Sequence, residues 1–112
     1  FYEVVIEGSA LLRFKQQKVN EIADTARMLE LDGYGIPVVN CSYNFGSEVC
    51  HELLTRYPEA KFACYYLDRK DGIQQWGLRS RKDFDCSIIA KRRGGGGHQQ
   101  ACGFELTRDK RI

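Results

Sequence analysis

The 112-residue chain lacks the motifs that mark several familiar classes of protein. None of its five cysteines forms a Cys-x-x-Cys pair, which excludes a zinc ribbon and a thioredoxin-type motif. No run approaches the roughly 18 apolar residues that a bilayer-spanning helix needs, so we expect no membrane partner. The cysteines are odd in number and widely spaced, which is typical of free thiols and fits a reducing cytoplasm better than secretion.

The sequence is also poor in groups that catalyse hydrolysis. Histidine occurs only twice, as His51 and His98, and no Asp-His-His or His-x-Glu grouping is present. Without an acidic or histidine cage for a divalent ion, we predict neither a metal site nor a catalytic residue in this chain. Because the chain begins at Phe1 rather than Met, we expect it to be a piece of a longer polypeptide.

The size and composition of the chain are those of one ordinary globular domain, with 43% hydrophobic and 29% charged residues. A net charge of +2 says little about partners, but its distribution says more. Eight Lys/Arg and only three acids fall between Arg69 and His98, around a run of glycines. Such a run is usually solvated surface, and an anion-binding face is the alternative that it also fits.

Four successive glycines, Gly94–Gly97, follow the basic run 91–93 and precede His98. Ordering this tetrapeptide is costly in backbone entropy, and a folded domain accepts that cost where the backbone approaches something closely or needs a positive φ. Bare N–H groups in such a loop form a concave nest that suits phosphate. A flexible linker is the alternative, but no serine accompanies the glycines and an apolar strand follows at once.

Apolar spacing and turn residues predict an alternation of helices and strands on a small sheet, in one compact domain of the α/β or α+β class. Residues 2–6 read as a strand or as the tail of a connection. The expected helices are 9–31, ended by Asp32-Gly33, then 47–57, then 86–93, capped by Asp83 or Asp85. The expected strands are 35–41, 60–67 in the centre of the sheet, 73–80 after the turn Asp71-Gly72, and 101–106.

Three side chains near the glycines are candidates for anion binding. The guanidinium of Arg79 presents a fork of donors that matches two phosphate oxygens, and Ser80 can donate one more hydrogen bond. His98 offers a donor nitrogen beside the glycine N–H groups. Each has a structural alternative, since Arg79 also suits a solvated strand end and His98 suits a turn.

These residues occur in a series of motifs: Leu78-Arg79-Ser80, then 85–90 (Asp-Cys-Ser-Ile-Ile-Ala), then 94–98, then 101–104 (Ala-Cys-Gly-Phe). The series resembles the C-terminal, DHH-associated substrate-binding domain (DHHA type) of DHH-family phosphoesterases, whose Gly-Gly-Gly-His loop continues as Ala-Ala-Gly-Phe. Cys102 stands where that family has alanine. The resemblance covers most of the chain, and only its part over 78–106 is specific.

The resemblance implies a small mixed sheet with flanking helices, residues 1–8 as the end of an interdomain connection and 9–112 as the substrate-binding domain. Gly95, Gly96, Gly97 and His98 would hold one substrate phosphate, and Arg79 with Ser80 would hold another or steady the nucleotide. The ligand implied is a phosphate-bearing nucleotide, a short oligonucleotide or single-stranded nucleic acid. Catalysis would belong to an N-terminal DHH domain, absent from this chain, that binds Mn²⁺. A homodimer is a further implied partner.

Three other interpretations stay open at this point. The related C-terminal domain of alanyl-tRNA synthetases is a non-hydrolytic RNA-binding module that also carries a glycine-rich loop, although a histidine directly after the glycines favours the phosphoesterase version. A free-standing nucleic-acid-binding protein should expose aromatic residues among its cations. An inorganic polyphosphate hydrolase would use the same phosphate-binding parts.

Overall fold

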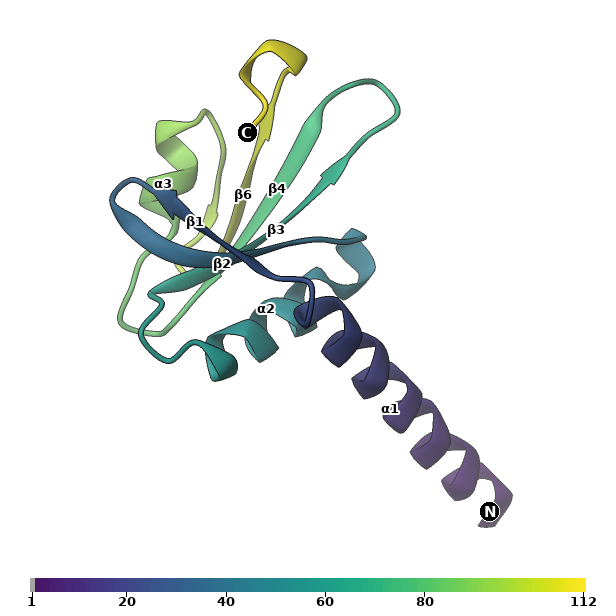
Figure 1. The fold of residues 1–112 in the computed structure, drawn as a ribbon. Coiled ribbons are helices and arrows are strands. Elements are labelled where there is room, and N and C mark those ends of the chain that lie inside the picture. Colours follow the sequence, from purple (N-terminus) through teal and green to yellow (C-terminus); the bar gives the residue numbers. More distant parts are fainter. Residues whose placement is uncertain (1) are drawn as a thin grey trace.

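A six-stranded sheet with helices on both faces organises the chain (Figure 1). The computed structural model describes residues 2–112, and their side chains from Gly8 onward. The helices are α1 (Tyr2–Ala23), α2 (Tyr43–Arg56) and α3 (Ser87–Arg92), with a 3-10 turn at Arg108–Lys110. The strands are β1 (Arg27–Leu31), β2 (Tyr34–Asn40), β3 (Phe62–Asp68), β4 (Gln74–Ser80), β5 (Gly96–His98) and β6 (Ala101–Leu106).

The strands lie in the order β1-β2-β3-β4-β6-β5, and the pair β2–β3 is parallel while every other neighbouring pair is antiparallel. This arrangement confirms the expected α+β domain with a mixed sheet. The strand predicted at 60–67 is indeed central. Its residues Ala63 and Cys64 are both 0% exposed although they point to opposite faces, because helices cover both sides of β3.

Two hydrophobic cores lie on the two faces of the sheet. The core under α1 and α2 includes Val39, Ala63 and Tyr65 from the sheet. The core under α3 includes Trp76, Leu78 and Phe104, where Trp76 stacks on the ring of Phe104 with centroids 5.7 Å apart. The N-cap of α3 is Cys86, not Asp83 or Asp85 as predicted, but Asp85 lies directly before it and its Oδ1 accepts a hydrogen bond of 3.0 Å from the backbone N–H of Ser87.

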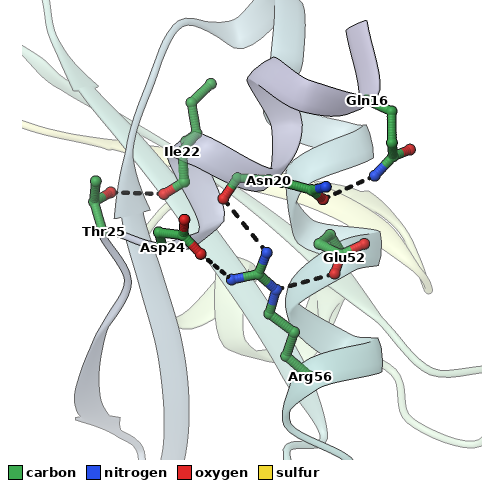
Figure 2. A network of polar contacts seen from close by, with 7 residues as sticks. All are labelled: Gln16, Asn20, Ile22, Asp24, Thr25, Glu52 and Arg56. Atoms are coloured by element: carbon green, nitrogen blue, oxygen red, sulfur yellow. Dashed lines mark hydrogen bonds and ion pairs between the residues drawn. The ribbon is translucent and has the colours of Figure 1, made fainter. Parts of the chain in front are cut away.

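The last turns of α1 are fixed to α2 by one arginine (Figure 2). Arg56, in the last turn of α2, donates to the carboxylates of Asp24 at 2.7 Å and Glu52 at 3.0 Å. It also reaches the backbone carbonyl of Asn20 at 3.4 Å, near the end of α1. The rest of α1 extends away from the sheet, as Figure 1 shows, and the α1 residues that join the core, Val19, Ile22 and Ala23, lie near its C-terminal end.

The sequence-based boundaries of the first helix are wrong at both ends. The helix ends at Ala23 instead of Leu31, and residues 27–31 form the edge strand β1. Asp32 and Gly33, with φ of 52° and 85°, form a two-residue hairpin turn to β2 and not a helix end. Tyr2–Ile6 is helical, not a strand. The interdomain connection expected at 1–8 stays a prediction, and Phe1 lies outside the described residues.

Among residues 2–112, no helix combines the length and the apolar character that crossing a bilayer would require.

Candidate functional site: a glycine-floored face beside Arg79 and His98

The pairing of β4, β6 and β5 places the predicted site residues on one face of the sheet. Arg79 and His98 both pair with Ala101, from opposite sides of β6. Gly77 and Gly96 likewise both pair with Gly103. Directly paired residues of antiparallel strands share a face. Eight residues therefore form the surface named here the glycine face: Gln75, Gly77, Arg79, Gly96, His98, Ala101, Gly103 and Glu105.

The glycine face is the more open side of this end of the sheet. Along β6, its residues Ala101, Gly103 and Glu105 are half-buried or exposed, whereas the alternating residues on the α3 side are buried. Arg79 and His98 lie two strand spacings apart, which is roughly 10 Å between backbones. Only the methyl group of Ala101 lies between them, so the two side chains border a shallow part of the glycine face that is lined by small residues.

The glycine run is not a free loop, because two of its four residues, Gly96 and Gly97, belong to the edge strand β5. Gly95 and Gly97 must be glycine for packing reasons. A Cβ on Gly95 would lie 2.0 Å from the carbonyl oxygen of Gly103, and one on Gly97 would lie 2.7 Å from Cα of Cys102. Gly97 also has φ of 136°, which side chains rarely adopt. This part of the run is explained by close approach to β6.

Gly96 has neither of these reasons. A Cβ built on it meets nothing within 4 Å, and its φ is not in the left-handed region. The space it leaves free is on the glycine face, between the backbone of β6 and solvent. The fold therefore tolerates a side chain at position 96, and the glycine keeps this part of the glycine face bare.

Tyr65 closes the glycine face on its α2 side. Its ring lies against Gly77, where a Cβ would come within 2.2 Å of it, and against Gly46 of α2, where a Cβ would come within 2.4 Å. The glycines of these two elements thus let a buried tyrosine lie flat between helix and sheet. The ring ends beside Arg79, whose guanidinium carbon is 5.9 Å from the ring centroid.

Arg79 itself is half-buried, and its Nη1 donates to the carbonyl oxygen of Leu78 at 2.8 Å. The ion pairs found in residues 8–112 do not include Arg79. Its charge is therefore not neutralised by a carboxylate within the described part of the chain. A guanidinium in this position retains donors for a further anionic partner.

His98 is exposed and precedes the two-residue turn Gln99-Gln100 between β5 and β6. The turn is fastened to the end of β4, because the carbonyl oxygen of Gln100 accepts from the backbone N–H of Ser80 at 3.1 Å. The hydroxyl of Ser80 donates to the carbonyl oxygens of Phe84 at 2.7 Å and Gln99 at 3.2 Å. These contacts hold His98 beside the strand that carries Arg79.

Ser80 does not share the glycine face with Arg79. It pairs with Phe62, whose side chain belongs to the core under α3, so the hydroxyl points to the opposite side of the sheet. The structure therefore brings Arg79, Gly96 and His98 together and separates Ser80 from them. Its contacts give Ser80 a part in positioning the turn, not in direct contact with a ligand on this face.

Four of the eight cations of the basic stretch, Arg69, Arg81, Arg92 and Arg93, are engaged elsewhere. Arg81 donates to the carbonyl oxygens of Leu54, Tyr57 and Ala60 at 2.7, 3.0 and 2.8 Å, at the end of α2. Arg93 contacts Asp32 at 2.9 Å, and this hydrogen bond holds the pKa of the Asp32 carboxyl below its ordinary value. These cations therefore make structural contacts within the domain, and their charge does not add to the positive surface expected around the glycines.

The acidic end of the glycine face is Glu105, which pairs with Arg69 at 2.8 Å. A shallow hollow of about 400 Å³ lies at this end, with Gln75, Gly95 and Gly103 in its lining. No cluster of three or more His, Cys, Asp or Glu side chains that would suit a metal ion occurs in the described part of the chain. The chemistry that this surface offers is recognition of an anion by donors.

Sequence reasoning did not place Ala101 and Gly103, two residues of the glycine face, in the site. The sequence pattern that could have identified them is the alternation in 101–106. There, small or polar residues occupy one face of the strand and buried residues occupy the other. The same alternation holds Gly77 and Arg79 on one side of β4. Without the strand register, nothing in the sequence shows that these two sets lie opposite each other.

No protein-family model and no curated protein matches this chain. A pGpG-specific phosphodiesterase, PggH, from Vibrio cholerae has a TM-score of 0.67 and 11% identity, over 94% of this chain and 37% of that one. An uncharacterized protein from Helicobacter pylori G27 has a TM-score of 0.59 and 18% identity, over 87% and 25%. An exopolyphosphatase-related protein from Bacteroides fragilis has a TM-score of 0.52 and 17% identity, over 82% and 29%.

At these identities the likeness establishes a shared fold and not an activity. The chain spans between 25% and 37% of the length of the solved chains that it matches. Each of those proteins therefore has a larger part with no counterpart in this chain, and the shared fold is one portion of each.

Proposed function

We propose that the glycine face binds the phosphate groups of a nucleotide or short oligonucleotide, and that the chain is the substrate-binding domain of a DHH-family phosphoesterase. The observation that carries the proposal is Gly96. Its bare backbone lies on the same face as an arginine without a carboxylate partner in the described residues and an exposed histidine. Packing does not require a glycine there, whereas close approach of a ligand to this face of the strand does.

Two kinds of support stand behind the family and the substrate. The motifs over 78–106 resemble the DHH-associated domain, and two of the structures with this fold are described as a pGpG-specific phosphodiesterase and an exopolyphosphatase-related protein. In this proposal Arg79 contacts one phosphate through its fork of donors, and His98 contacts a second phosphate or the other side of the same one. The chain binds and orients the ligand.

Hydrolysis is assigned in this proposal to an N-terminal DHH domain that binds Mn²⁺ and supplies an activated water. Residues 8–112 would present the substrate phosphate to that domain from the glycine face. Five free, buried cysteines accord with a cytoplasmic setting for the whole enzyme.

The test measures binding of a 5′-phosphorylated dinucleotide such as pGpG to the 112-residue chain by calorimetry. Arg79→Ala, His98→Ala and Gly96→Ala should each weaken binding by about tenfold or more, because each removes a charge-assisted contact or blocks the approach to the backbone. Lys91→Ala is the matched control, since Lys91 is an exposed cation on α3, on the other side of the sheet. Equal affinity of the wild type and all three variants would overturn the site.

Inorganic polyphosphate is the second candidate ligand, which the likeness to the exopolyphosphatase-related protein favours. The two ligands are separated by competition in the same experiment. If the dinucleotide with a 5′-hydroxyl binds as well as the phosphorylated one, the site does not recognise the terminal phosphate. If polyphosphate displaces the dinucleotide and binds more tightly, the ligand class shifts to polyphosphate while the site stands.

A further inference from the structure

Two cysteines meet in the core under α3. Cys86 lies directly before α3, Cys102 lies in β6, and their sulfur atoms are 2.9 Å apart. Both residues are buried, at 0% and 7% exposure. The other three cysteines of the chain have no sulfur partner within hydrogen-bonding range. The pair is therefore singled out by geometry from the rest of the thiols.

We infer that Cys86 and Cys102 form a reversible disulfide when the folded protein meets hydrogen peroxide. A disulfide requires a sulfur–sulfur distance of about 2.05 Å, so the two atoms need to approach by less than roughly 1 Å. The two cysteines are 16 positions apart, and the fold already brings their sulfur atoms into contact. The inference is independent of the proposed phosphate site, which uses the other face of the sheet.

The surroundings of the two thiols assign them different parts in the reaction. The hydrogen bond with Cys102 lowers the pKa of Cys86 below that of a free thiol, against the opposing effect of burial. The same hydrogen bond and burial raise the pKa of Cys102. The thiolate and not the thiol is the nucleophile, so we take Cys86, whose pKa is lowered, as the residue that attacks the oxidant. Cys41, Cys50 and Cys64 have pKa values raised by burial and remain thiols.

The reaction is balanced by one molecule of peroxide. Cys86 sulfur attacks a peroxide oxygen, the O–O bond breaks, and hydroxide leaves, which gives a sulfenic acid on Cys86. Cys102 sulfur then attacks Cys86 sulfur, the S–O bond breaks, and the oxygen leaves as water once it takes up the proton that Cys102 loses. Overall the two thiols lose two electrons and two protons, and peroxide is reduced to two waters.

The bond would close a loop that contains α3, the glycine run and His98. Cys102 pairs with Gly97 across the β5–β6 ladder, so the link would hold the start of α3 to the strand on which β5 rests. The backbone N–H of Cys86 already donates to the carbonyl oxygen of Gln99 in the same hairpin at 2.8 Å. Oxidation would thus convert an existing set of contacts into a covalent one.

The test uses the 112-residue chain in native buffer with hydrogen peroxide, followed by alkylation of free thiols, trypsin digestion and mass spectrometry without reduction. Cleavage after Lys91 and Arg93 separates the two cysteines, so the disulfide would join the peptides 83–91 and 94–108. We expect two of the five thiols to be lost, this joined peptide to appear, and dithiothreitol to restore all five.

The variants Cys86→Ala and Cys102→Ala should each give no joined peptide under the same treatment, and Cys86→Ala should keep its four remaining thiols. Cys64→Ala is the matched control, because it removes a buried cysteine of the same core and should still lose two thiols. The inference is overturned if the wild type keeps five free thiols, or if the linked peptides contain Cys41, Cys50 or Cys64. A disulfide between two chains, seen on a non-reducing gel, would overturn it as well.

Discussion

Arg79 and His98 lie opposite the same residue, Ala101, on the two strands that flank β6. The guanidinium comes from the end of a long central strand, and the imidazole comes from a three-residue edge strand. What joins them is the hairpin turn at 99–100, which Ser80 holds by its backbone and its hydroxyl. The strand register sets the relative position of Arg79 and His98, so substitutions that disturb the turn or β5 should shift His98 relative to Arg79.

The first prediction concerns the glycine run, where neighbouring positions should respond differently. Gly97→Ala should destabilise the chain by about 1–3 kcal/mol, since its Cβ would lie 2.7 Å from Cα of Cys102 at a φ of 136°. Gly96→Ala should change stability by less than about 0.5 kcal/mol, because a Cβ there meets nothing within 4 Å. Urea unfolding of both variants measures the difference. Equal loss at the two positions would mean that position 96 is packed.

The second prediction separates two arginines that are two positions apart. Arg81→Met should cost about 2–3 kcal/mol, because three carbonyl oxygens at the end of α2 lose a charged donor. Arg79→Met should cost less than about 1 kcal/mol, since its side chain contacts one neighbouring carbonyl and the Tyr65 ring. The binding assay should rank them in the reverse order, with the larger loss of phosphate affinity for Arg79→Met. Thermal unfolding and calorimetry on the same samples give both rankings.

The third prediction tests the positioning role of Ser80. Ser80→Ala removes the donor to the carbonyl oxygens of Phe84 and Gln99, which should lower stability by about 1 kcal/mol. Amide exchange should become faster in the turn 99–100 because it loses one of its attachments to β4. Ser80→Thr keeps a hydroxyl and should restore slow exchange. Fast exchange in both variants would show that the hydroxyl contacts do not hold the turn.

The sequence predicted the sheet class, the central strand and the second and third helices, because each of these has a strong local pattern. Residues 60–67 are apolar on both alternating sets, and Asp85, directly before the N-cap of α3, accepts a hydrogen bond from the backbone N–H of Ser87. Arg79 and His98 were identified by their chemistry. Their proximity needs the β4–β6–β5 register, a long-range pairing between segments about 20 residues apart.

The failures have a physical cause in competing local signals. Asp32-Gly33 suits both a helix end and a two-residue hairpin turn. The hairpin forms because Leu29 and Leu31 gain burial in an edge strand paired with β2. The glycine run suggested an open nest, but two of its residues are needed for close packing on β6. Only contact with the rest of the sheet distinguishes those two from Gly96.

The fourth prediction concerns acid. Arg93 and Arg92 lower the pKa of Asp32, so the folded state binds a proton on this carboxyl less readily than the unfolded state does. The stabilisation from this ion pair is therefore complete above the ordinary carboxyl pKa of about 3.9, and it is lost as the pH falls through the lower folded value. Asp32→Asn should destabilise the chain near pH 7, and this difference should shrink as the pH falls below the ordinary carboxyl pKa of about 3.9. Asparagine suits the test because it also tolerates the positive φ of 52° at this turn.

Urea unfolding of the wild type and the Asp32→Asn variant at a series of pH values measures the gap between their free energies of unfolding. Asp83→Asn is the matched control, since Asp83 is in none of the ion pairs of the described residues and no large gap should open at any pH. A gap for Asp32→Asn that stays constant from neutral pH to acid would contradict the prediction. A constant gap would mean that Asp32 stabilises the chain through the conformation of the turn. A gap that closes in acid shows that the charge of Asp32 stabilises the contact between the β1–β2 hairpin and the end of α3.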